Sequence, residues 1–271
     1  MENEEVTYGS VKASGSELSY AKFGHGKEVF VLLPGLHSKS LMPFAPAVAK
    51  QYGKFLDFFT IYMFDRISNP QEAYSIRDMA KDTISAIEEL KIKDACVLGV
   101  SMGGMIAQTI AVERSDLVKK LAVCSTTPRM NEKSLKVIGE WKRLAEANQQ
   151  KELAQMLGET IYTPGFYESY KDAIIESFAG ASGSEIRRFI ICTNAILNFD
   201  ISSELGKIKA PLFVVAGAQD LIFTTELADE IAEKTGAKEY IYPNYGHSAY
   251  DEAPDFLDRV WNFFKPTTSS F

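Results

Sequence analysis

The stretch from Ala95 to Ala111 constrains the fold more than any other part of the chain, because it has the pattern of a strand, a tight turn and a buried helix in succession. Its first part, ACVLGV, is a short apolar run of the kind that forms a buried strand. Its last part, MIAQTIA, is apolar on nearly all sides, which is typical of a helix packed between layers. The pattern therefore predicts an α/β fold with a parallel sheet.

Ser101 lies at the turn of this stretch, within Gly99-Val100-Ser101-Met102-Gly103. A chain that passes directly from a strand into a helix must bend sharply, and the two glycines, which lack a Cβ, let the strand and the helix approach each other. We expect Ser101 to have a strained backbone and an accessible hydroxyl. The N–H of Met102, in the first turn of the helix, is then free to donate to an oxyanion. An inert serine at a glycine-packed crossing is the alternative.

Two further side chains follow the ends of later predicted strands. Asp220 comes just after the apolar run 212–216, and His247 lies in a loop after the strand 239–242. In open α/β sheets, ligands bind at the carboxyl ends of the strands. We therefore expect His247 to accept the proton of Ser101 and Asp220 to hold the imidazole ring in place. The alternatives are a turn aspartate that caps its own backbone and a loop histidine without chemistry.

A second oxyanion donor is expected after another buried strand. The apolar run of residues 28–33 ends in Pro34-Gly35-Leu36-His37. A glycine at the carboxyl end of a central strand can bring the next N–H, that of Leu36, towards the crevice. His37 lies close by, where it either orients the loop or touches the substrate, and we favour the first role.

Residues 129–206 differ in pattern from the rest of the chain, because apolar residues recur there at helical spacing and no strand interrupts them. We interpret the segment as a helical cap inserted into an α/β core made of residues 1–128 and 207–271. Its aromatic residues Trp141, Tyr162 and Phe166 are candidates for lining a substrate pocket. They are equally candidates for the core of the cap.

Elsewhere the pattern predicts short elements. A hairpin is expected from residues 6–11 and 17–23, and strands from residues 58–64 and 117–125. Helices are expected at residues 75–90, 225–234 and 253–264.

Composition narrows the class of protein. The chain has 271 residues and a net charge of −7, and no stripe of lysine or arginine that would favour nucleic acid as a partner. No apolar run approaches the roughly 18–20 residues that span a bilayer. The acidic start, Met1 to Glu5, lacks the features of a signal peptide. We expect a cytoplasmic protein that acts on a small molecule without metal, organic cofactor or membrane. Its oligomeric state is left open.

The order Ser101, Asp220, His247, together with residues 98–108 and the turns that carry the other two side chains, resembles the α/β-hydrolase family. The resemblance is to its capped serine hydrolases, which include esterases, enol-lactonases, perhydrolases and carbon–carbon hydrolases. It implies a mostly parallel eight-stranded sheet with helices on both faces and a helical cap. It also implies that these three residues form a catalytic triad with the Leu36 and Met102 amides as the oxyanion hole.

The chain departs from the family pattern at two places. It has Pro34-Gly35 where many relatives have His-Gly, and residues 65–70 lack the glycines of the usual Asp-x-Arg-Gly-x-Gly-x-Ser. Our hypothesis is a serine hydrolase that cleaves a small carboxylic ester or lactone through an acyl-enzyme. The alternatives are a carbon–carbon hydrolase of a diketone-like substrate and a ligand-binding member of the fold without turnover.

Overall fold

The computed structural model describes residues 5–265, so the acidic residues 1–4 at the start of the chain lie outside them. Eight strands form one sheet in the order β1-β2-β4-β3-β5-β6-β7-β8. The first two strands pair antiparallel and β2 pairs antiparallel with β4, whereas all pairs from β4 to β8 are parallel. The predicted fold class is therefore confirmed. The strands are β1 Thr7–Ala13, β2 Ser16–Phe23, β3 Glu28–Leu33, β4 Phe59–Phe64, β5 Ala95–Val100, β6 Val118–Cys124, β7 Leu212–Gly217 and β8 Lys238–Tyr242.

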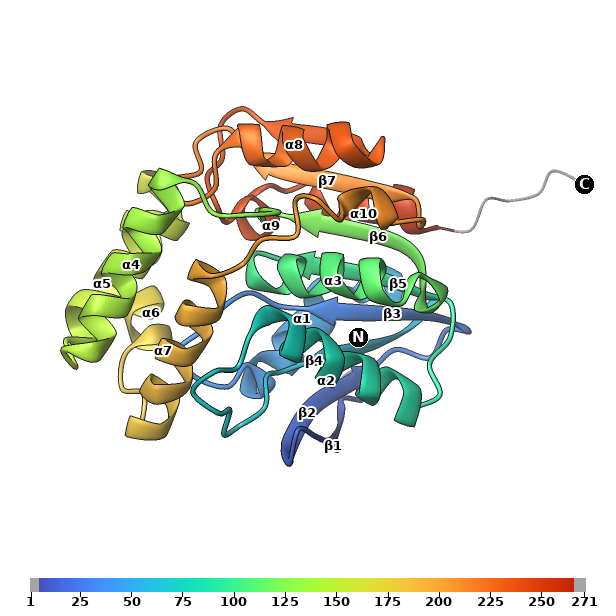
Figure 1. Ribbon diagram of the computed structural model, residues 1–271, viewed down its shortest axis with the longest axis horizontal. Coiled ribbons are helices and arrows are strands. Elements are labelled where there is room, and N and C mark those ends of the chain that lie inside the picture. Colours follow the sequence, from blue (N-terminus) through green and yellow to red (C-terminus); the bar gives the residue numbers. More distant parts are fainter. Residues whose placement is uncertain (1–4, 266–271) are drawn as a thin grey trace, which may run out of the picture.

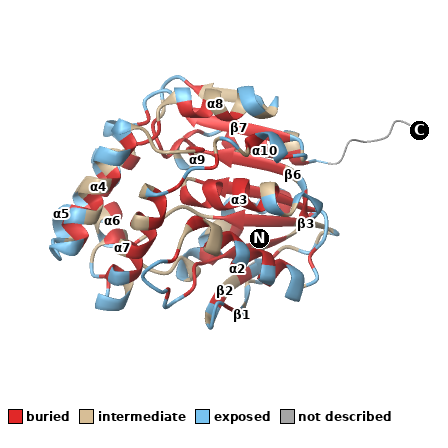
Figure 2. Cartoon of the chain, viewed as in Figure 1, coloured by how far each residue is buried: buried red, intermediate tan, exposed pale blue. Residues whose placement is uncertain are grey.

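Helices cover both faces of this sheet (Figure 1). Alternate residues of each central strand point to opposite faces, so that Val97 joins the core beneath α2, α3 and α8, and Leu98 joins the core beneath α1 and α10. Figure 2 shows the buried residues concentrated in the strands and on the inner sides of the helices. These helices are α1 Ala45–Gln51, α2 Ile76–Glu89, α3 Met102–Glu113, α8 Thr225–Thr235, α9 Ala249–Glu252 and α10 Phe256–Phe264.

The end of the chain differs from the sequence prediction. The helix expected over residues 253–264 begins only at Phe256, and the four-residue helix α9 precedes it. Pro254 explains the break, because a proline disfavours helical backbone in the residue before it. Ala253 accordingly has an extended conformation, with φ −79° and ψ 119°.

Residues 129–206, which we call the helical segment, connect β6 to β7 and contain α4 Glu132–Glu146, α5 Gln150–Ile161, α6 Pro164–Phe178 and α7 Gly183–Leu197. Its four helices gather beyond one end of the sheet, on the side where β6 ends (Figure 1). Arg129 and Asp200 form an isolated antiparallel bridge, and the N–H of Ile201 donates to the carbonyl of Pro128 at 2.9 Å. The two ends of the segment therefore lie side by side.

The length and composition of the helices show whether any of them could cross a membrane. No helix between residues 5 and 265 combines the length and the apolar character that crossing a bilayer requires.

Candidate active site

Ser101 occupies the turn between β5 and α3, with a φ of 54° and a ψ of −119°. A positive φ is uncommon outside glycine and is found at strained, functional turns. The surrounding glycines explain how this turn is accommodated. A Cβ on Gly103 would lie 1.9 Å from the carbonyl oxygen of Leu33, and one on Gly99 would lie 2.5 Å from the carbonyl oxygen of Gly103. Backbone thus packs directly on backbone around Ser101.

The structure brings Ser101, His247 and Asp220 together in one chain of hydrogen bonds. Nε2 of His247 lies 3.0 Å from Oγ of Ser101, and Nδ1 of His247 lies 2.8 Å from Oδ2 of Asp220. A carboxylate oxygen accepts but does not donate, so Nδ1 carries the proton and Nε2 is left to accept from the serine hydroxyl. This is the arrangement that a general base needs in order to activate an alcohol.

The aspartate is itself held rigidly. Oδ1 of Asp220 accepts from the N–H of Ile222 at 2.7 Å and from the N–H of Phe223 at 3.0 Å, and its side chain is buried. The loop that bears His247 lies directly against the turn that bears Asp220. A Cβ on Gly217 would be 2.1 Å from the carbonyl oxygen of Gly246. These contacts hold the imidazole ring in one orientation.

Two backbone amides adjoin the serine. The N–H of Met102 is in the first turn of α3, where no helical partner exists. Leu36 follows Gly35, at which a Cβ would lie 3.2 Å from Cβ of Ser101. Within residues 5–265, neither amide donates a hydrogen bond to another protein atom. Both are therefore available to a ligand beside Ser101.

Arg66 sets the orientation of one of these amides, a role that the sequence did not reveal. Its Nη1 donates to the carbonyl of Gly35 at 2.9 Å, and its Nη2 donates to the carbonyl of Lys39 at 3.2 Å. In a trans peptide the C=O and the following N–H point in opposite directions. By holding the Gly35 carbonyl on one side, Arg66 turns the Leu36 N–H to the other.

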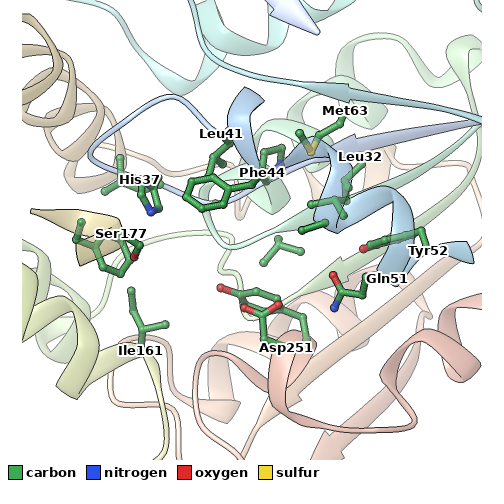
Figure 3. Close-up of a pocket in the computed structure, with 18 of the residues that line it drawn as sticks. Leu32, His37, Leu41, Phe44, Gln51, Tyr52, Met63, Ile161, Ser177 and Asp251 are labelled. Atoms are coloured by element: carbon green, nitrogen blue, oxygen red, sulfur yellow. The ribbon is translucent and has the colours of Figure 1, made fainter. Parts of the chain in front are cut away.

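A cavity of about 480 Å³ adjoins the serine turn, between the ends of β3 and β5, α1, α9 and the helical segment (Figure 3). Of the four predicted pocket residues, His37 and Tyr162 line this cavity, whereas Trp141 and Phe166 are not among its lining residues. Trp141 is buried in the apolar core with the other helices of the segment. The ring of Phe166 stacks on that of Tyr162, with centroids 5.2 Å apart.

His37 fits the structural role that we favoured for it, although it also borders the cavity. Its ring stacks on Phe178 with centroids 4.4 Å apart, and the N–H of Lys39 donates to its Nδ1 at 3.2 Å. Burial, followed by the positive charge of Arg66, lowers the pKa of His37 to about 3. The ring is consequently neutral at physiological pH and cannot hold an anion by charge.

Other lining residues come from elements that no local motif singled out. Gln51 ends α1, Tyr52 follows it, and Tyr250 and Asp251 belong to α9. They are brought together only by the folding of segments about 200 residues apart in sequence. Position in the chain therefore gave no sign that they share a cavity.

The helical segment is tied to the loop that carries His247. The N–H of Ser248 donates to the carbonyl of Ile161 at 2.9 Å, and the N–H of Thr163 donates to Oε1 of Glu252 at 3.0 Å. The hydroxyls of Thr163 and Ser248 also donate to the Glu252 carboxylate. The junction between α5 and α6 is thus joined to the residues that follow the histidine.

The sequence of this chain is similar to those of known hydrolases. A 3-oxoadipate enol-lactonase of Acinetobacter baylyi is 25% identical over 223 residues, which cover 79% of this chain and 80% of that protein. The mouse serine hydrolase BPHL is 22% identical over 268 residues, covering 94% of this chain and 85% of that protein.

Solved structures share the architecture. MGS-M2, an alpha/beta hydrolase from a deep-sea metagenome library of the Medee basin, superposes with a TM-score of 0.85 at 20% identity, covering 97% of this chain and 99% of that one. An enol-lactonase from Burkholderia xenovorans superposes with a TM-score of 0.82 at 24% identity, covering 94% and 99%. The model of the alpha/beta hydrolase fold family matches residues 29–254, which are most of the chain, and this protein therefore belongs to that family.

Proposed function

We propose that this alpha/beta hydrolase is a serine hydrolase that cleaves a small carboxylic ester or lactone through an acyl-enzyme. The observation that carries the proposal is the 3.0 Å separation between Nε2 of His247 and Oγ of Ser101. A serine hydroxyl is a weak nucleophile until a positioned base removes its proton. Two relatives are named as an enol-lactonase and a serine hydrolase, and both names agree with this chemistry.

In the acylation step, Oγ of Ser101 attacks the carbonyl carbon while its proton moves to Nε2 of His247. The carbonyl oxygen becomes an oxyanion that accepts from the N–H groups of Leu36 and Met102. Each such donor contributes roughly 2.7–4 kcal/mol to lowering the barrier. Asp220 stabilises the imidazolium that forms. The tetrahedral intermediate then expels the alcohol, which takes the proton from Nε2.

In the second step, a water molecule gives its proton to Nε2 of His247 and attacks the acyl-enzyme. The same two amides hold the second oxyanion. Collapse releases the carboxylic acid, and the proton returns to Oγ of Ser101. Besides the substrate and this water molecule, no further reactant is needed to balance the sequence. Residues 129–206 act in this proposal as a cap that covers the cavity in which the substrate is held.

A fluorophosphonate probe tests the proposal directly, because it labels only an activated serine. We expect the wild-type protein to be labelled at Ser101 and the Ser101→Ala variant to remain unlabelled. A folded wild-type protein that resists labelling would contradict the proposal and favour a ligand-binding role. Rates on short nitrophenyl esters, compared with rates on a vinylogous diketone acid, separate ester cleavage from carbon–carbon cleavage. A clear preference for the diketone acid would overturn the proposed reaction.

A further inference from the structure

The cavity beside Ser101 has two chemically different ends. Most of its lining is apolar, from residues such as Leu32, Leu41 and Met63. Polar side chains meet at the opposite end from His37, where Figure 3 shows Gln51 beside Asp251. The hydroxyl-bearing rings of Tyr52, Tyr162 and Tyr250 also line the cavity. A ligand that fills this space therefore meets a localised polar site.

Asp251 is the one lining residue of the cavity with a carboxylate, and that carboxylate lacks a counterion. Within residues 5–265, no lysine, arginine or histidine lies within ion-pair distance of it. Its side chain is exposed, and it lines the cavity. Burial, followed by the negative charge of Glu252, raises the pKa of Asp251 to about 7, while the Gln51 side chain acts in the opposite direction. A carboxylate that lines a largely apolar cavity without a counterion gains from a positively charged partner.

The ionisable groups around Asp251 supply no such partner. Glu252, on the same helix, already accepts hydrogen bonds from Thr163 and Ser248. Tyr52, Tyr162 and Tyr250 have raised pKa values and stay neutral, as does the thiol of Cys124 on β6, mainly because all four are buried. The unpaired charge is therefore open to a ligand.

The charges that line the cavity indicate whether the ligand is a cation or an anion. Among the residues that the structure describes, none of those lining the cavity is lysine or arginine, and His37 is neutral. An anionic ligand would meet only the negative charge of Asp251. A cation would neutralise it and would also lie among aromatic rings, including Phe44 and Phe178, whose faces attract positive charge. The net charge of −7 on the chain favours the approach of cations as well.

We propose that the polar end of this cavity binds a primary ammonium group through Asp251, so that the preferred substrates are esters or lactones with an ammonium group on the part that fills the cavity. The selectivity rests on the proposed hydrolase function, whereas the binding of the ammonium group does not. Catalysis at Ser101 and recognition at Asp251 are then separate parts of one pocket.

Matched pairs of esters test the selectivity. 4-Nitrophenyl ω-aminoalkanoates of six to eight carbons are compared with alkanoates of the same length, and aminoalkyl acetates with alkyl acetates, after the uncatalysed rate is subtracted from each rate. At pH 8, where the Asp251 carboxyl is ionised, we expect kcat/KM for the best ammonium ester to exceed that of its neutral partner by about ten- to a hundredfold. The ratio should fall at pH 6, where Asp251 is protonated. Because both esters need the same His247, any effect of pH on catalysis itself is common to the two and cancels from the ratio.

The Asp251→Asn variant keeps the size of the side chain and removes the charge. We expect it to bring the ratio close to one at both pH values. Asp172→Asn is the matched control, because Asp172 is an exposed residue of α6 without an ion pair in the described part of the chain. It should retain the wild-type ratio. A wild-type ratio at or below one in both ester series, a ratio that rises as the pH falls, or an unchanged ratio in Asp251→Asn would overturn the proposal.

A binding measurement needs neither turnover nor a variant. Calorimetry should detect hexylammonium binding to wild-type protein at pH 8, about tenfold tighter than at pH 6, while hexanol binds more weakly. Binding of hexylammonium that is independent of pH, or no tighter than that of hexanol, would contradict the cation site even if esters are hydrolysed. Binding as expected without hydrolysis of any ester would leave the cation site in place and reject the serine hydrolase function.

Discussion

The turn around Ser101 and the helical segment beyond it are built in opposite ways. Around the serine, main chain packs on main chain, and an added Cβ at Gly103 or Gly217 would lie about 2 Å from a carbonyl oxygen. In the helical segment, an added Cβ at Gly139 or Gly165 would meet no atom within 4 Å. The serine turn has no room for a methyl group at Gly103, whereas the helical segment has room at Gly139 and Gly165, although not at Gly158 beside Tyr167.

If the proposed function is right, the rigid region fixes the positions of the reacting groups, and the walls of the cavity select the substrate. The distance between a nucleophile and its base must be right to within a fraction of an ångström, and rigid main-chain packing provides that accuracy. A cavity wall tolerates many side chains, because it needs only the right shape and charge. Here the wall combines the helical segment with α1 and α9.

The largest difference between the two regions is expected when a serine hydroxyl is removed from each, because Ser101 is the proposed nucleophile. Ser101→Ala should lower kcat/KM on a nitrophenyl ester by about ten-thousandfold or more, because no other group of the site can attack the carbonyl. Ser169→Ala, on the exposed face of α6, removes the same hydroxyl from the helical segment. Its activity should stay within about twofold of the wild type. Substantial hydrolysis by Ser101→Ala would reject the assigned nucleophile.

The packing contrast itself can be measured with one substitution in each region. Gly103→Ala forces a methyl group against the Leu33 carbonyl and should lower the free energy of unfolding by roughly 3 kcal/mol. Gly139→Ala, in α4, should raise it by up to about 1 kcal/mol through better helix propensity. Chemical denaturation measures both. Equal effects of the two substitutions would show that the regions do not differ in the way described.

Arg66 extends the rigid region through a side chain. Arg66→Met removes the bond to the Gly35 carbonyl and should lower kcat by about ten- to a hundredfold, because the Leu36 N–H is no longer held towards the oxyanion. KM should change little, since the oxyanion forms only after substrate binds. Arg187→Met removes an exposed guanidinium of α7 and serves as the control. A change in KM alone would assign Arg66 to substrate binding instead.

The smallest expected effect concerns Asp251 and stability. With a pKa raised to about 7, the folded protein retains a proton on Asp251 that the unfolded chain loses near its ordinary pKa. This group therefore lowers stability as the pH rises from about 4 to 7, and its effect is constant above that range. Asp251→Asn should be more stable than wild type by about 1 kcal/mol at pH 8. This value is kept small because water in the cavity screens the charge, and the difference should be smaller still at pH 5. Thermal unfolding at the two pH values checks this.

The sequence predicted the parts of the molecule that depend on local pattern. The strand, turn and helix around Ser101 follow from glycine spacing and apolar runs, and the predicted hairpin and parallel strands are confirmed. Asp220 and His247 could be singled out because each comes just after a strand, and parallel strands end at one edge of a sheet. Their assigned roles remain proposals.

The cavity was less accessible to prediction. Helical spacing shows that Trp141 faces a buried side, but not whether it packs against a substrate or against other helices, and the structure places it in the core. Asp251 lies on a four-residue helix that has too few residues to show a period. The contribution of Arg66 to the Gly35 peptide depends on two loops whose meeting point no pattern encodes.

The bonds between the α5–α6 junction and the His247 loop have a consequence for how the enzyme opens. Any movement that lifts this junction away from the sheet must first break the bonds from Ser248 to Ile161 and from Thr163 to Glu252. The histidine loop would lose these supports at the same moment, although its contacts with the turn of Asp220 would remain. In the proposed mechanism, opening the pocket would therefore loosen the loop of the base that activates Ser101, so that entry of the substrate and the chemical step would need different positions of the helices.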